Sequence, residues 1–256
     1  MAIDHALLET AGREGCAFLR IYQWQQPTIS LGYFQNYAER EEHRESSKLD
    51  IVRRSTGGGA IVHDHDWTYS VCIPNALLDS TIGAVPDLYE AIHSAVIQWL
   101  AKQGVHASQV AESACSSVPD SAEGCSFLCF ERRSPGDVVS QGHKILGSAQ
   151  RRKHGALLQH GSLLLRQSES APSLKGLAEI IEEISPPAGQ PEASTGGRQP
   201  DFDKLSADAT GFSQSLKNAM EDFCQIRFEN ATKMQQFVPE PVNQGIFSQD
   251  SWLYRR

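Results

Sequence analysis

The chain has 256 residues, a mass of 28.2 kDa, 40% apolar residues and 21% charged residues. This composition is ordinary for a globular protein and excludes disordered and fibrous classes. No window approaches the roughly 18 consecutive apolar residues of a membrane helix, so we expect no association with a membrane.

The N-terminal residues and the cysteines indicate a cytoplasmic protein. Residues 1–15 carry acids early and lack the basic start and apolar stretch of a secretory signal. The six cysteines are sparse and form no CxxC pair: Cys16, Cys72, Cys115, Cys125, Cys129 and Cys224. We therefore expect reduced thiols and not a disulfide framework.

The formal charge of −8 disfavours a nucleic-acid-binding protein, which is normally basic. The basic residues are nevertheless unevenly placed. Eight of the 23 fall in four short groups: Arg53-Arg54, Arg132-Arg133, Lys144 and the run 151–153. Basic groups usually form a solvated face, but three of these flank glycine-containing turns, which favours a binding site.

Hydrophobic periodicity predicts an alternation of helices and strands in the first half of the chain. The expected elements are a helix over 3–11, strands over 17–24 and 27–34, a polar helix over 36–46, a strand–glycine turn–strand unit over 50–63, a strand over 67–73 and a long helix over 84–103 that ends at Gly104.

The second half predicts a meander of three strands over 137–166, with turns at Gly142 and 151–155, and helices over 173–184 and 212–225. Four prolines and three glycines mark 185–200 as a mobile surface loop, and 111–125 is expected to be a second one. Turns like those of hairpins join most strands. The sequence therefore predicts one domain over 1–256, an α/β (α+β) fold with a mixed, largely antiparallel sheet flanked by helices, and a short helical extension over 201–256.

Three motifs carry the chemistry. The first, RRSTGGGA, places Arg53 and Arg54 before Gly57, Gly58 and Gly59, whose backbone can approach a ligand closely. The second, GHKILGSAQ, places Lys144, Ser148 and Gln150 on a strand; by alternation, Lys144, Leu146 and Ser148 share one face. The third, HGSLLL, begins with His160 and Gly161. Each alone is more typical of a hairpin, a surface lysine or a structural histidine.

In combination and in this order, the motifs resemble those of the lipoate/biotin protein ligase and octanoyltransferase family. RIYQWQQPTISLGYFQN also resembles the family's early strand pair, and the resemblance covers about residues 17–166. It implies a catalytic domain like that of class II synthetases. It also implies transfer of an octanoyl or lipoyl chain to a lysine of a carrier domain. The glycine turn would line the acyl pocket, Lys144 would lie beside the acyl carbonyl and the arginines would face phosphates of the acyl donor.

Cys129 decides which reaction the resemblance favours. Cys129-Phe130 resembles the Cys-Phe of the cysteine-dependent octanoyltransferases, which take the chain from acyl carrier protein through a thioester. A thiol attacks as a thiolate, which the nearby cations Arg132, Arg133 and Lys144 would favour. Lys144 could also stabilise the oxyanion or exchange a proton with Cys129. The alternative interpretation is that Cys129 is a small buried residue, like Cys72.

The main hypothesis is therefore an acyltransferase with Cys129 and Lys144 as catalytic residues and Arg53, Arg54, Gly57, Gly58, Gly59, Ser148, Gln150, His160 and Gly161 as substrate-binding residues. The resemblance implies acyl carrier protein as donor and lipoyl-carrier proteins as acceptors, such as glycine cleavage H protein and 2-oxoacid dehydrogenase acyltransferase subunits. It implies no required cofactor.

Two alternatives stay open: an ATP-dependent lipoate–protein ligase that uses Mg²⁺, and a non-catalytic protein that binds lipoyl domains or an acyl ligand. The sequence DWTYS at 66–70 is closer to octanoyltransferases than to ligases. The neighbouring His63, Asp64, His65 and Asp66 resemble metal ligands, but alternation separates the histidines from the acids, so no metal site is expected.

Overall fold

The computed structural model describes residues 1–78, 85–112, 126–185 and 199–230. Its helices are α1 (Ala2–Glu14), α2 (Asn75–Leu78), α3 (Val85–Lys102), α5 (Leu177–Ile184), α6 (Phe202–Ala207) and α7 (Ala209–Cys224), with short 3-10 helices η1 (Tyr37–Glu42), η2 (Arg44–Ser46) and η3 (Cys129–Glu131). Its strands are β1 (Phe18–Tyr22), β2 (Thr28–Leu31), β3 (Asp50–Arg53), β4 (Ile61–His63), β5 (Asp66–Pro74), β6 (Ser108–Gln109), β7 (Val138–Ser140), β8 (His143–Lys153) and β9 (Ala156–Leu164).

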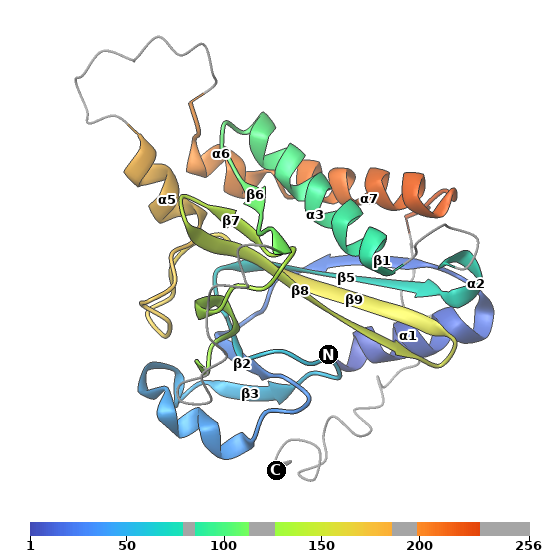
Figure 1. Cartoon of the computed structure of the whole chain (residues 1–256), viewed down its shortest axis with the longest axis horizontal. Coiled ribbons are helices and arrows are strands. Elements are labelled where there is room, and N and C mark those ends of the chain that lie inside the picture. The colour runs from blue at the N-terminus through green and yellow to red at the C-terminus, as the bar shows by residue number, and fades with distance from the viewer. Residues whose placement is uncertain (79–84, 113–125, 186–198, 231–256) are drawn as a thin grey trace.

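A six-stranded sheet in the order β1-β5-β9-β8-β7-β6 forms the centre of the molecule (Figure 1). Every neighbouring pair in it is antiparallel. A smaller sheet, in the order β3-β2-β4, contains one parallel pair. The predicted fold class, a mixed and largely antiparallel sheet flanked by helices, is confirmed.

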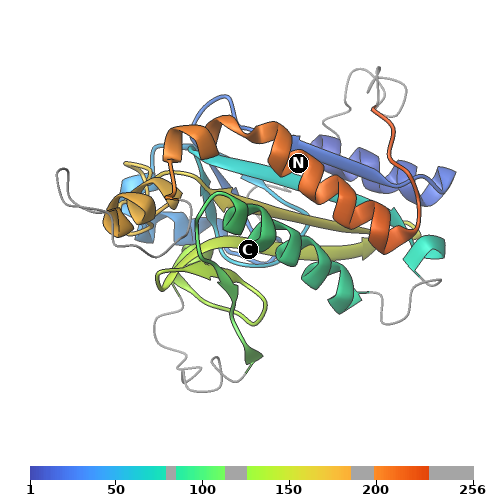
Figure 2. The same cartoon turned by 90° about the horizontal axis from the view of Figure 1, so that it is seen from above.

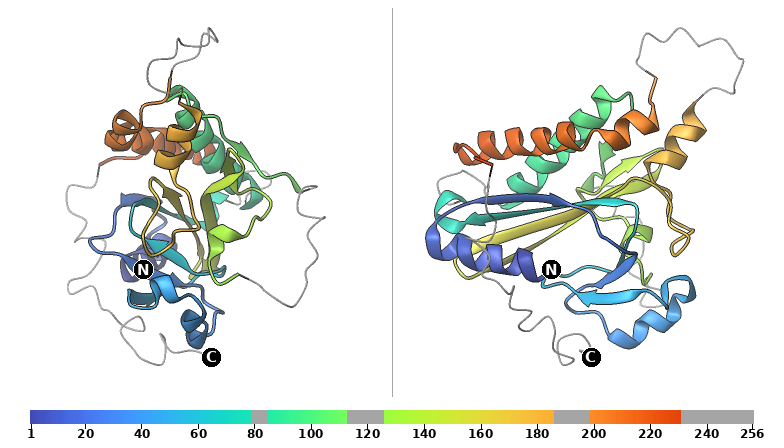
Figure 3. Two further views of the ribbon diagram at one scale, coloured as in Figure 1. Left: turned by 90° about the vertical axis from the view of Figure 1, so that its left-hand side faces the viewer. Right: turned by 180° about the vertical axis from the view of Figure 1, so that it is seen from behind.

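Alternation along β5 assigns the two faces of the large sheet. Trp67, Tyr69, Val71 and Ile73 join the main core under α3 and α7, whereas Cys72 packs with residues of α1 on the opposite face. Figures 2 and 3 show α3 and α7 crossing one face of the sheet, with α1 and the small sheet on the other side. Within the described residues, no helix combines the length and apolar character needed to span a bilayer.

The chain between residues 36 and 63 differs most from its prediction. The polar helix over 36–46 is instead η1 and η2, and none of the residues of η1 is buried. The glycine turn does not join a hairpin, because β3 and β4 pair with opposite edges of β2 and not with each other. The turn therefore crosses the end of β2, which places its glycines beside the large sheet.

The C-terminal part is described only as far as residue 230. α7 packs into the main core through Phe212, Leu216 and Met220. α6 was not predicted from the sequence. Most of the loop expected at 185–200, most of that at 111–125 and the end of the extension lie outside the described residues, so the domain organisation stays a prediction.

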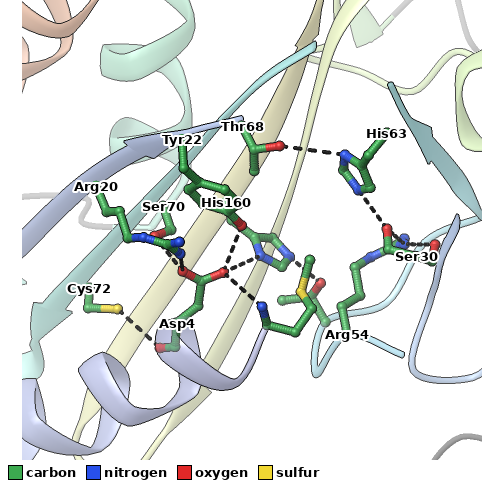
Figure 4. Close-up of polar contacts among 12 residues, drawn as sticks. Asp4, Arg20, Tyr22, Ser30, Arg54, His63, Thr68, Ser70, Cys72 and His160 are labelled. Atoms are coloured by element: carbon green, nitrogen blue, oxygen red, sulfur yellow. Dashed lines mark hydrogen bonds and ion pairs between the residues drawn. The ribbon is translucent and has the colours of Figure 1, made fainter. Parts of the chain in front are cut away.

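A buried chain of hydrogen bonds links the two sheets through Asp66, at the start of β5. Its Oδ2 accepts hydrogen bonds from Ser162 of β9 at 2.6 Å and Thr68 at 2.9 Å, and lies 2.9 Å from Nδ1 of His63. His63 Nε2 lies 2.8 Å from Ser30 Oγ of β2 (Figure 4). Burial alone would raise the pKa of Asp66, but His63 and the hydroxyl donors outweigh it and lower that pKa.

We predict that Asp66→Asn lowers the free energy of unfolding at pH 7 by about 3 kcal/mol, because it breaks a buried charged network. The low folded-state pKa stabilises the wild type above the unfolded pKa of about 3.9, and this stabilisation is lost as the pH falls further. Urea unfolding between pH 3 and 7 should thus show a flatter pH dependence for the variant. Asp64→Asn on the same turn is the control, and parallel curves for Asp66→Asn and the wild type would contradict the prediction.

Candidate active site

A cavity of about 420 Å³, including its mouth, lies between the two sheets. Its exposed wall atoms are mostly carbon. Its lining residues come from both sheets, the glycine turn, the loop before β7 and the chain start: Met1, Ser30, Arg54, Gly57, Gly58, Ile61, His63, Thr68, Cys129, Gly147, Ser148, Ala149, His160, Gly161 and Ser162.

The buried guanidinium of Arg54 shapes the glycine turn. It donates to the carbonyl oxygens of Ser30 at 2.7 Å, Gly57 at 2.9 Å and Gly59 at 2.6 Å. Burial lowers the pKa of Arg54 to about 10, which still leaves the group protonated at neutral pH. Arg54 therefore holds the carbonyl groups of the turn by hydrogen bonds and links the turn to β2.

Arg53 has a similar structural role outside the cavity. It is buried, and Nη1 donates to the carbonyl oxygens of Gly32 at 2.7 Å and Gln35 at 2.6 Å. These contacts occupy donors that the sequence interpretation directed at phosphates of an acyl donor. In this structure both arginines of the motif hold backbone carbonyls, and only Arg54 lines the cavity.

His160 holds the glycine turn from the other side. Its Nε2 lies 2.6 Å from Thr56 Oγ1, and its Nδ1 lies 3.9 Å from Asp4 Oδ2. Asp4, buried on α1, also accepts hydrogen bonds from Arg20 at 2.9 Å and Ser70 at 2.8 Å (Figure 4). Burial lowers the pKa of His160, which favours the neutral imidazole. His160 thus connects the turn to α1 and the large sheet, and Arg151 of β8 also donates to the Ser55 carbonyl oxygen beside the turn.

Cys129 lines the cavity, whereas Lys144 is not among the lining residues but approaches the thiol from beside it. Lys144 Nζ lies 3.7 Å from Cys129 Sγ, 3.4 Å from the Cys129 carbonyl oxygen and 2.7 Å from Asp137 Oδ2. The backbone N–H of Cys129 donates to the Ala60 carbonyl oxygen at 2.8 Å, and the Ala60 N–H donates to the Phe127 carbonyl oxygen, which holds the cysteine next to the glycine turn. A Cβ on Gly59 would lie 3.0 Å from the Cys129 nitrogen, so the glycine permits this approach. The loop before β7 therefore folds back far enough to place a thiol beside a lysine.

A β-bulge determines where Lys144 points. The register of β7 against β8 shifts, with Val138 opposite Leu146 but Val139 opposite Lys144. Leu146 packs in the main core, whereas the end of the Lys144 side chain lies over Gly147, where a Cβ would be 2.7 Å from Cε. The prediction that Lys144, Leu146 and Ser148 share one face is wrong, because strict alternation does not hold across the bulge.

The remaining predicted residues are divided between the cavity and its supports. Ser148 lines the cavity while its Oγ contacts Tyr69 and His93. Gly161 also lines it. Gln150 does not line the cavity. Its side-chain amide instead donates a hydrogen bond to Gln159 at 2.7 Å. Of the other cysteines, Cys72 and Cys224 are buried, Cys16 is exposed, and Cys115 and Cys125 lie outside the described residues.

Asp137 is the main residue that the sequence interpretation missed. Burial raises the pKa of Asp137, and the neighbouring Lys144 offsets only part of that rise. The sequence feature that could have identified Asp137 is its position directly before the first strand of the hairpin around Gly142.

The prediction that alternation keeps His63 and Asp66 on opposite sides was also wrong, because the chain turns between β4 and β5 and brings these two side chains together. His65 instead lies near Asp64, so the four side chains do not converge.

Comparisons with known proteins identify a matching family, related sequences and similar folds. Residues 1–184 match the family described as the lipoyl protein ligase A/B catalytic domain. Octanoyltransferase LipM of Carboxydothermus hydrogenoformans is 37% identical over 169 residues, which cover 65% of this chain and 60% of the relative. The corresponding protein of Moorella thermoacetica is 39% identical over 170 residues, covering 64% of this chain and 60% of the relative. The matched part thus spans less than two thirds of these relatives.

Among solved structures, lipoate-protein ligase A bound with ATP has a TM-score of 0.60 and 19% identity. The alignment covers 99% of this chain and 93% of that one. At this identity the likeness concerns the fold alone, and it agrees with the observed sheet and helices.

We predict that Gly58→Ala destabilises the protein, whereas Gly57→Ala does not. Gly58 has φ +92°, and its added Cβ would lie 3.0 Å from Arg54 Nη2. A non-glycine residue in such a conformation costs about 1–3 kcal/mol. A Cβ on Gly57 meets only the Phe34 ring, at 3.8 Å. Urea unfolding should separate the two variants, and equal free energies of unfolding would show that Arg54 does not constrain the turn as described.

Proposed function

The chain belongs to the lipoyl protein ligase A/B catalytic-domain family, and from this premise we propose that it transfers an octanoyl chain from a carrier protein to a lysine of a lipoyl-carrier domain, through a thioester on Cys129. The observation that carries the proposal is the contact of 3.7 Å between Lys144 Nζ and the Sγ of Cys129, a residue that lines the cavity. The similarity to octanoyltransferases supports the same reaction.

In the first step the Cys129 thiolate attacks the carbonyl carbon of the octanoyl thioester. The new C–S bond forms as the carrier thiolate leaves, and the carrier takes up a proton. Negative charge develops on the carbonyl oxygen, and the ammonium of Lys144 is close enough to Cys129 to stabilise it. The mostly apolar cavity wall suits an alkyl chain.

In the second step the neutral amine of the acceptor lysine attacks the acyl-Cys129 carbonyl. An amide bond forms, the C–S bond breaks, and the thiolate is regenerated as the amine loses its proton. Because the donor is already a thioester, this sequence needs neither ATP nor a metal ion. A ligase would first activate a free acid with ATP, and Cys129 would then have no covalent role.

We predict that Cys129→Ala lowers octanoyl transfer at least about 10³-fold, because it removes the nucleophile. The assay combines octanoyl–acyl carrier protein, apo H protein and the enzyme without ATP. Intact mass should show one octanoyl group on the wild type and none on the variant. Cys16→Ala, which removes an exposed cysteine, is the matched control. Transfer at the wild-type rate by Cys129→Ala, or transfer that requires ATP and free acid, would overturn the proposal.

We also predict that Lys144→Met lowers the rate about 10²–10³-fold and slows the alkylation of Cys129 by iodoacetamide at neutral pH. The methionine retains much of the lysine stem and removes the cation. Lys144→Arg should not restore activity, because a planar guanidinium cannot replace a compact ammonium at one carbonyl. Asp137→Asn, which removes the negative partner of Lys144, should produce a smaller loss.

Mass spectrometry of the peptide that contains Cys129 follows the alkylation specifically. Loss of activity without a change in Cys129 alkylation would separate Lys144 from the thiol and favour the ligase. Full activity of Lys144→Met would remove the lysine from the mechanism.

A further inference from the structure

Three possible metal ligands come together on the α1 side of the large sheet. His5 and Glu9 lie one helical turn apart on α1, and His154 lies in the turn between β8 and β9. Glu9 Oε1 is 3.4 Å from Nε2 of His5 and 3.4 Å from Nε2 of His154. Among the described residues, these three are the one group of at least three histidine, cysteine or carboxylate side chains whose ligand atoms all lie within 4.8 Å of one another.

The backbone brings together the two segments that carry these side chains, of which Glu9 and His154 are exposed. Gly12 brings α1 against the turn so closely that a Cβ there would lie 1.7 Å from the His154 carbonyl oxygen. His154 itself has φ +54°, a left-handed conformation in which histidine is enriched among non-glycine residues. The i, i+4 spacing places His5 and Glu9 on one face of the helix. Figure 1 shows α1 running alongside β9, near the end where β8 and β9 join.

The distances match those of a tetrahedral metal site. Zinc binds imidazole nitrogen and carboxylate oxygen at about 2.0–2.2 Å, which separates neighbouring ligand atoms in a tetrahedron by about 3.3–3.5 Å. Two of the three separations here equal 3.4 Å. Two imidazoles with one carboxylate form a ligand set typical of Zn²⁺, whereas Mg²⁺ and Ca²⁺ prefer oxygen ligands alone. The positive charges of Arg151 and Lys153 lower the pKa of His5, and they would also repel a metal cation bound at this position.

From this geometry we propose that His5, Glu9 and His154 bind one Zn²⁺ ion, with water as the fourth ligand. The ion joins α1 to the β8–β9 turn. It uses none of the cavity residues, so it does not depend on the proposed acyl transfer. Its effect is structural: α1 also carries Asp4, which contacts His160 in the cavity wall.

The test measures Zn²⁺ binding by calorimetry and thermal unfolding of the metal-free protein with and without the ion. Zn²⁺ at about 100 times its Kd should raise Tm by about 5–10 °C. His154→Asn keeps a residue that tolerates positive φ, and Glu9→Gln keeps the size of the side chain. Each should weaken Zn²⁺ binding at least about tenfold and remove most of the Tm increase. His65→Ala is the control, since His65 is exposed and pairs with Asp64 at 3.6 Å.

Substitution by Co²⁺ distinguishes this site from metal binding by the thiols. The proposed site gives a tetrahedral spectrum with nitrogen and oxygen ligands and no thiolate charge-transfer band. Absence of Zn²⁺ binding, binding that survives both His154→Asn and Glu9→Gln, or a thiolate spectrum would each overturn the proposal. These outcomes leave the Cys129 mechanism unaffected, since that is measured by octanoyl transfer without added metal.

Discussion

The cavity depends on one buried cation whose hydrogen bonds go to the backbone. An isolated charge in a protein interior is costly, and Arg54 meets that cost by donating to carbonyls of β2 and of the glycine turn. Because those carbonyls belong to two different segments, the guanidinium helps to set the separation between β2 and the turn, together with the backbone hydrogen bond from Tyr33 to Thr56. The position of Cys129 follows, since its backbone is bonded to Ala60 immediately after that turn.

On the α1 side of the cavity, a buried carboxylate has a comparable structural role. Asp4 is buried beside Arg20, Tyr22 and Ser70, and it lies next to His160. Burial raises the pKa of Asp4, but His160 and the neighbouring positive charges lower it further than burial raises it. The glycine turn is thus held between a guanidinium on one side and an imidazole on the other. A flexible segment of small residues becomes a fixed wall without bulky side chains that would fill the cavity.

The sequence predicted those parts of the fold that local patterns determine. Alternation located β5, β8 and β9, and helical periodicity located α1 and α3 within a few residues. The pairing of β3 and β4 with opposite edges of β2 was not accessible, since nothing local distinguishes that arrangement from a hairpin. The motifs identified seven of the fifteen residues that line the cavity, including Gly57, His160 and Cys129. They also assigned Arg53 and Gln150 to the site, although neither lines the cavity. Residue type does not show whether a side-chain donor is already hydrogen-bonded within the protein, as both of these are.

The bulge in the β7–β8 hairpin relates the length of this segment to its chemistry. A strand presents successive residues to opposite faces, so the face of any residue depends on whether an even or odd number of positions separates it from a fixed point. Lys144 reaches Cys129 because one position is added between it and Leu146 in the ladder. Residues on the exposed side of this hairpin can be substituted without changing the direction in which Lys144 points. Insertion or deletion of a single residue there reverses its direction, so the number of residues in this segment is constrained more strictly than their identity.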